Sequence, residues 1–124
     1  MATKTYDATD GVLASTAANW VGGVAPITGG VDDVVFDATG AAHNCTWDLA
    51  ITLKTFSMNA GFAAVVTVAA ATNWGTTGDI SIHAGTFTPV TSSVVTCAGS
   101  FVQDGGTITE MQLTPWIHSL ALSF

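Results

Sequence analysis

The chain is poor in charged residues and has almost no positive charge. Of its 124 residues only Lys4 and Lys54 are basic, whereas nine are acidic, and the formal net charge is −7. Because a protein that binds nucleic acid must neutralise several phosphates with Lys or Arg, we expect no DNA or RNA partner. The same charge argues against binding to an anionic membrane surface. The most apolar run, from Gly61 to Ala71, is too short to span a bilayer, so we expect no membrane partner.

The sequence also has few residues suited to catalysis or metal binding. Its two cysteines, Cys45 and Cys97, lie far apart without a C-x-x-C pair, and they read as small buried apolar residues. His43, His83 and His118 fall in no H-x-x-x-H or H-E-x-x-H spacing. We therefore expect no catalytic residue, no cofactor and no enzymatic activity.

Helix signals and a secretory signal are missing as well. No stretch keeps an apolar stripe at helical spacing for three turns, and the N-terminal segment lacks the apolar core of a signal peptide. Instead, short runs of Val, Ile, Phe and Thr alternate with Gly, Asn and Asp. This pattern predicts an all-β protein that is synthesised in a cytoplasm.

The most informative feature present is a 21-residue repeat. The segment GDISIHAGTFTP, which begins at Gly78, aligns with GSFVQDGGTITE, which begins at Gly99. Three columns of residues share this period. The apolar column comprises Cys45, Val66, Phe87 and Ile108; the threonine column Thr46, Thr67, Thr88 and Thr109; and a third column Leu53, Trp74, Val95 and Trp116.

A fixed period of this length is typical of stacked repeat architectures. Leucine is too scarce for a leucine-rich repeat, so the short strands and glycine corners favour a short parallel β-solenoid with coils of about 21 residues. Strand alternation would then place the apolar column inside and the threonine column outside. An antiparallel β-sandwich or jelly roll is the alternative.

The repeat divides one domain into three parts. Residues 1–40 form an N-terminal cap or entry segment, residues 41–113 the repeat region, and residues 114–124 an apolar C-terminal strand. In that strand an uncovered apolar face would promote aggregation, so a neighbouring subunit is expected to cover it. The predicted interface residues of this homo-oligomer, for which a trimer is favoured, are Trp116, Leu120, Leu122 and Phe124.

One acidic cluster is a candidate ion site. Asp32, Asp33 and Asp37 could supply oxygen ligands to Ca²⁺, although no D-x-D-x-D-G loop is present. The favoured interpretation is a turn in which these side chains accept hydrogen bonds from local backbone N–H groups. In the 21-residue register His118 would follow Cys97 by one coil, but two ligands do not make a zinc site.

The segment before the repeat carries a recognisable pattern. It reads N-W-x-G-G-x-x-P from Asn19, then D-D-V-V-F-D from Asp32, then C-T-x-D from Cys45. Between Asn19 and Phe87 the chain resembles the entry segment of β-helical modules in bacteriophage virion proteins and autotransporter-type adhesins. The missing signal peptide and the short repeat array favour the virion family. The resemblance implies a virion location, synthesis in the host cytoplasm and other virion proteins as partners.

Three functions therefore remain open. The first is a virion structural protein, such as a capsid decoration, cement or fibre component. The second is a glycan-binding adhesin or tail-fibre module that uses Trp and Asp on one flank. The third is an ice- or surface-binding solenoid, since the T-x-T units at Thr86–Thr88 and Thr107–Thr109 would lie on neighbouring coils.

Overall fold

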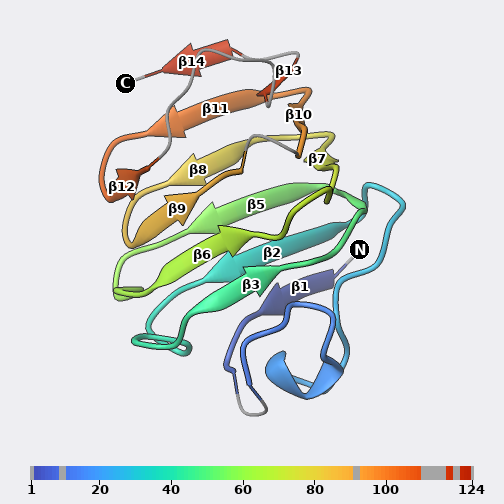
Figure 1. The fold of residues 1–124 in the computed structure, drawn as a ribbon, viewed down its shortest axis with the longest axis vertical. Coiled ribbons are helices and arrows are strands. Elements are labelled where there is room, and N and C mark those ends of the chain that lie inside the picture. The colour runs from blue at the N-terminus through green and yellow to red at the C-terminus, as the bar shows by residue number, and fades with distance from the viewer. Residues whose placement is uncertain (1, 9–10, 91–92, 110–116, 119–120, 124) are drawn as a thin grey trace.

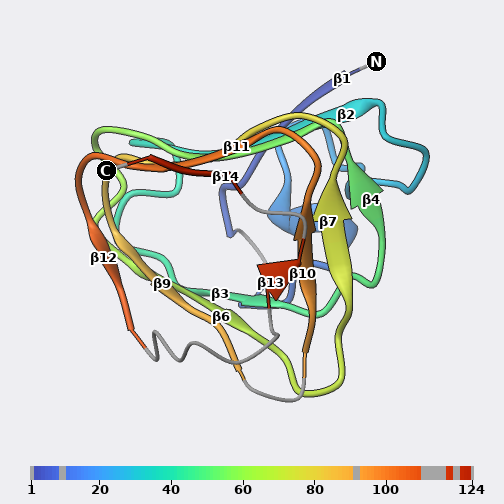
Figure 2. The same ribbon diagram turned by 90° about the horizontal axis from the view of Figure 1, so that it is seen from above.

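Every pairing between the named strands is parallel, and successive strands of each sheet come from successive passes of the chain (Figure 1). The computed structural model describes residues 2–8, 11–90, 93–109, 117–118 and 121–123. Seen along the stacking direction, three sheets surround a common interior (Figure 2). The predicted parallel β-solenoid is confirmed, and the antiparallel sandwich is not the fold.

The three sheets are the faces of the solenoid. The first sheet has the order β1 (Ala2–Thr5), β2 (Asp32–Phe36), β5 (Thr55–Met58), β8 (Ile80–Ile82), β11 (Ser100–Gln103) and β14 (Ala121–Ser123). The second sheet has the order β4 (Thr52–Leu53), β7 (Trp74–Thr76), β10 (Val95–Cys97) and β13 (Ile117–His118). The third sheet has the order β3 (Cys45–Trp47), β6 (Val65–Val68), β9 (Thr86–Thr88) and β12 (Thr107–Ile108), and a 3₁₀ helix, η1, spans Ala17–Asn19.

The register of the third sheet confirms the first two columns. The apolar column pairs in equal steps, from Cys45 to Val66, then to Phe87 and to Ile108. The first three of these side chains are buried, and the neighbouring threonines are half-buried on the outer face. Side-chain alternation along each strand therefore sorts the columns as the sequence predicts.

The third column is wrong at two of its members. Trp74 pairs with Val95 as predicted, but Leu53 pairs with Thr76, and Val95 pairs with Ile117. At Leu53 the cause is corner length, because the corner between Trp47 and Leu53 is two residues shorter than the one between their partners Val68 and Thr76. Trp116 itself lies outside the described residues.

The interior is filled by inward-facing columns. In the first sheet Val34, Phe56, Ile80 and Phe101 pair in succession, and all four are buried. The steps along this column are unequal, and the longest is the one from Phe56 to Ile80. Insertions in the corners therefore leave the stacking intact. Burial of such columns is the main stabilising term of the fold.

Aromatic rings occupy the centre of this interior. The Phe56 ring centroid lies 5.4 Å from that of Phe36, 5.5 Å from Trp47, 4.9 Å from Trp74 and 5.9 Å from Phe87. These rings come from the first, second and third sheets, so they link all three faces. Tilted and edge-on pairs of this kind add about 0.5–1.5 kcal/mol each beyond their burial.

The N-terminal residues close one end of the interior. Leu13 forms a parallel bridge with Thr46, which places this segment beside β3. The buried Trp20 indole donates a 2.7 Å hydrogen bond from Nε1 to the Ala14 carbonyl oxygen, and Asn19 Nδ2 donates one of 3.0 Å to the Leu13 carbonyl oxygen. β1 and β2 continue the first sheet, so this entry segment contributes strands as well as a cap.

The C-terminal segment is distributed over two faces. β13 pairs with β10 in the second sheet, whereas β14 pairs with β11 in the first. The described parts of the predicted strand from residue 114 to residue 124, β13 and β14, thus pair in two different sheets, and the other residues of that prediction lie outside the described residues.

Candidate functional site

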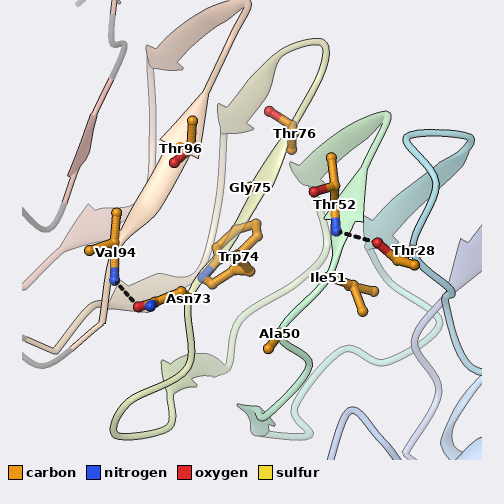
Figure 3. Close-up of a pocket in the computed structure, with 10 residues that line it drawn as sticks. All are labelled: Thr28, Ala50, Ile51, Thr52, Asn73, Trp74, Gly75, Thr76, Val94 and Thr96. Atoms are coloured by element: carbon orange, nitrogen blue, oxygen red, sulfur yellow. Dashed lines mark hydrogen bonds between the residues drawn. The ribbon is translucent and has the colours of Figure 1, made fainter.

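A groove of about 450 Å³ opens on the second sheet, across β4, β7 and β10 (Figure 3). Gly75 lies at its centre and pairs with Thr52 on one side and Thr96 on the other. A Cβ atom on Gly75 would collide with the Thr96 backbone carbonyl group, so glycine is required here. The two exposed threonines and the glycine between them form the hollow, which we call the Gly75 groove.

The rim of the Gly75 groove is polar and uncharged. Asn73 Oδ1 accepts a hydrogen bond of 2.9 Å from the Val94 N–H, and Thr28 Oγ1 accepts one of 3.1 Å from the Thr52 N–H (Figure 3). The hydroxyls of Thr52 and Thr96 and the Asn73 amide nitrogen form no hydrogen bond within the described part of the chain. None of the described residues that line the groove is ionisable.

The second candidate surface is a set of exposed apolar side chains spread along the N-terminal segment. Its members are exposed by between 41% (Val31) and 59% (Ile27), and the described residues contain no other exposed large apolar side chain. We call this surface the cap patch. It comprises Val12, Leu13, Val21, Val24, Ile27 and Val31. The segment that carries it runs around the N-terminal end and up one flank, in blue to cyan in Figure 1.

Hydrogen bonds hold part of the cap patch in place. The buried carboxylate of Asp32 accepts a 2.9 Å bond from the Ile27 N–H through Oδ2. The Gly30 N–H donates a 3.0 Å bond to the Thr52 carbonyl oxygen, which fixes the loop against β4. Ile27 is therefore presented outward by an anchored backbone.

The third candidate surface is the outer face of the third sheet. Thr46 pairs with Thr67, and Thr67 pairs with Thr88, so the predicted ladder is present. The Thr109 hydroxyl continues it by donating a 2.8 Å hydrogen bond to Thr88 Oγ1. The T-x-T units of β9 and β12 lie side by side, but the matching positions in β6 and β3 keep only one threonine each.

The candidate calcium residues lie along and just after β2 but do not converge on a site. Asp32 Oδ2 accepts from the Ile27 N–H, and Asp37 Oδ1 accepts a 2.9 Å bond from the Thr39 N–H. Asp33 Oδ1 instead accepts a 2.6 Å bond from the Thr55 hydroxyl. Among the described residues no group of three His, Cys, Asp or Glu side chains could hold a metal ion. The carboxylates of Asp32 and Asp37 thus act as turn acceptors, as the favoured interpretation predicts.

The buried thiol of Cys45 is held in its unreactive form. Burial raises its pKa to about 12, and the nearby charge of Asp48 adds to the rise. Burial likewise raises the pKa of Tyr6 above its ordinary value, and the Tyr6 hydroxyl donates a 2.8 Å hydrogen bond to the Asn44 carbonyl oxygen. At neutral pH this thiol is protonated, and a protonated thiol is a poor nucleophile.

The proposed stacking of Cys97 and His118 is wrong by one position. His118 pairs with Thr96, whereas Cys97 pairs with Thr76, because the step from β10 to β13 is one residue longer than the step from β7 to β10. A different histidine has an acidic neighbour one coil away. His83 Nδ1 contacts Asp104 Oδ1, and both side chains are exposed to solvent.

The predicted interface lies outside the part of the chain whose side chains are described. Trp116, Leu120 and Phe124 fall outside the described residues, and for Leu122 only the backbone pairing of β14 is given. Sequence reasoning missed the Gly75 groove and the cap patch. The sequence signal for the groove is Gly75 itself. It pairs with Thr52 on one side and Thr96 on the other, although the two coils that separate these residues differ in length.

The described residues contain no helix long and apolar enough to cross a membrane. No family model, curated protein or solved structure matches the chain.

Proposed function

We propose that this chain is a structural protein of a bacteriophage-like virion: a capsid decoration, cement or fibre component that acts by subunit packing. The observation that carries the proposal is the cap patch. Apolar surface contributes about 25 cal/mol for each Å² buried, so covering these exposed side chains with a partner would stabilise an assembly. The occupants that we propose are further copies of the chain, with a trimer favoured, and other virion proteins.

The rest of the surface suits a particle component. Outward positions on the third sheet carry threonine, and those on the first sheet include Ser57 and Ser81. Hydroxyl groups and a net charge of −7 keep such a surface hydrated without a large number of ion pairs. The resemblance of the entry segment to virion β-helical modules supports the same assignment.

The packing role is tested by measuring the mass of the protein in solution. Light scattering coupled to size exclusion is expected to give a trimer or a higher assembly. The double variant Val24→Ser/Ile27→Ser removes two exposed apolar side chains whose loop is held by backbone contacts, and it should shift the mass to the monomer. Val102→Ser is the matched control, because Val102 lies between two serines on the first sheet.

A monomeric wild-type protein, or a double variant that assembles as the wild type does, would contradict the packing role. Circular dichroism checks that both variants keep the β-fold. The virion assignment has its own test. Mass spectrometry of particles purified from the source should detect peptides of this chain at a fixed ratio to the major shell protein, and their absence would refute the assignment.

A further inference from the structure

We propose that the Gly75 groove binds a neutral, polyhydroxylated ligand, chemically a pyranose sugar unit. The proposal is independent of the virion assignment, since it rests on the groove alone. A volume of about 450 Å³ lies within the range of small-molecule sites. The groove has a fixed shape, because its centre is the backbone of a strand that pairs on both sides.

The polar groups of the groove select the class of ligand. The hydroxyls of Thr52 and Thr96 can each donate and accept, and the Asn73 amide nitrogen can donate two hydrogen bonds. These groups are not engaged within the described part of the chain. A ligand with several hydroxyls matches them in both directions. No ionisable side chain among the described lining residues would neutralise a charged ligand.

A peptide strand is a poorer match to the same groove. A strand that binds by augmentation needs the unpaired backbone groups of a sheet edge. Here the Gly75 N–H already donates a 3.1 Å bond to the Ile51 carbonyl oxygen, and the Trp74 N–H donates a 3.0 Å bond to that of Val94. The groove is a sheet face, so side-chain hydroxyls rather than backbone groups meet the ligand.

Apolar side chains border the groove. Ile51 and Val94 are half-buried, whereas Trp74 packs in the interior against Phe56 and is only 4% exposed. Trp74 Nε1 is buried and has no hydrogen-bond partner among the described residues. A pyranose presents C–H groups on one side and hydroxyls at its rim. The half-buried Ile51 and Val94 and the hydroxyl groups at the rim of the groove match that division.

The experiment titrates the full-length chain with the methyl glycosides of glucose, galactose, mannose and N-acetylglucosamine and with maltose. Two-dimensional NMR of ¹⁵N-labelled protein follows the Asn73 side-chain amide and the Gly75 and Thr96 backbone amides. At least one glycoside is expected to shift these signals in a saturable way. Removal of a ligand hydrogen bond of about 1 kcal/mol weakens binding about fivefold, so Thr52→Val/Thr96→Val should lose at least tenfold.

Threonine and valine have nearly the same shape, so these exposed substitutions leave the strands in place. Thr67→Val, on the outer face of the third sheet, is the matched control and should bind as the wild type does. Asn73→Asp keeps the acceptor for the Val94 N–H but removes the amide donor, and it should also weaken binding. The proposal is overturned if none of the glycosides shifts these amides, or if the double threonine variant binds as tightly as Thr67→Val.

Discussion

The N-terminal end of the solenoid and its stacked coils are stabilised in different ways. The coils reuse one environment, so that Phe56, Ile80 and Phe101 occupy equivalent inward positions on successive passes. The N-terminal end uses contacts that occur once, such as the Trp20 indole bonded to Ala14 and the Leu13 bridge to Thr46.

The same two regions also differ at their surfaces. The coils present threonine and serine columns, whereas all the exposed large apolar side chains of the described residues lie in the N-terminal segment. Repetition builds a rod whose sides are uniform. The features that distinguish one position from another arise at the end cap and where a column is interrupted, as at Gly75.

The largest effect is expected where the two regions share an interior. Phe56→Ala removes a ring that contacts Phe36 of β2 on one side and Phe87 of β9 on the other. Truncation of a buried phenylalanine costs about 3–5 kcal/mol, a large fraction of the stability of a small domain. Urea unfolding should show a single transition at a much lower midpoint.

Val102→Ser, at an outward and half-buried position, is the control and should change the midpoint little. If Phe56→Ala produced two separate transitions, the cap and the coils would be independent units. The cap and the coils would then be two separate folding units rather than two regions of one cooperative structure.

A smaller effect is expected when the same substitution, glycine to alanine, is made once in a coil corner and once in the cap loop. Gly85 and Gly23 have nearly the same positive φ, +72° and +71°. A Cβ atom on Gly85 would lie 2.6 Å from the Phe62 ring and 3.0 Å from the Ala64 carbonyl oxygen, whereas one on Gly23 would meet nothing within 4 Å. Gly23→Ala should therefore cost only the left-handed strain of about 1–2 kcal/mol, and Gly85→Ala a further 1–3 kcal/mol or so from crowding.

Thermal and urea unfolding of the two alanine variants measure this difference. Equal losses would show that the coil corners yield as easily as the cap loop, contrary to the contrast drawn between them. Gly85 belongs to the Gly-Thr pair that the two aligned copies of the 21-residue repeat share. Glycine at this position of the repeat is therefore explained by the lack of space for a Cβ atom, whereas the apolar and threonine positions are explained by the alternation of side chains along a strand.

The sequence predicts the regular part of the molecule and fails where regularity ends. The columns through Cys45 and Thr46 are correct because the coils that join β3, β6, β9 and β12 are equal in length. The predicted pairing of Leu53 with Trp74 is wrong because the corner before Leu53 is two residues shorter than the corresponding corner of the next coil. A fixed 21-residue period in the sequence cannot reveal such a change in corner length. The Gly75 groove escaped prediction for the same reason, since it depends on which residue faces Gly75 across the unequal coils.

The cap was harder to predict because its contacts are not repeated. Trp20 could be assigned to a cap from its motif, but its bond to Ala14 and its neighbours Tyr6 and Phe36 depend on chain folding over short irregular segments. The exposure of Val24 and Ile27 has no sequence signal, because valine and isoleucine also form the buried columns. Only the three-dimensional path of the loop distinguishes them.

A gradual effect, spread over several pH units, is expected at the junction between the cap and the coils, where the Tyr6 hydroxyl donates a hydrogen bond to the Asn44 carbonyl oxygen beside Cys45. The pKa of Cys45 rises from about 9 to about 12 on folding, and that of Tyr6 also rises. Between those two values for Cys45 the unfolded chain loses a proton that the folded chain keeps. The stabilisation from the Cys45 thiol is therefore fully present below pH 9 and falls above it by up to about 1.4 kcal/mol per pH unit, whereas that from Tyr6 begins to fall only above about pH 10.

Urea midpoints measured from pH 8 to pH 11 test this decline at the junction. Cys45→Ala removes one titrating group and Tyr6→Phe removes the other. In each variant the decline of stability with rising pH should be less steep than in the wild type, even if the absolute stability also changes. If the wild-type midpoint stayed constant over this interval, Cys45 and Tyr6 would be accessible to solvent. The cap would then be a loose attachment, whereas the burial of Tyr6, Trp20 and Cys45 indicates a closed end to the solenoid interior.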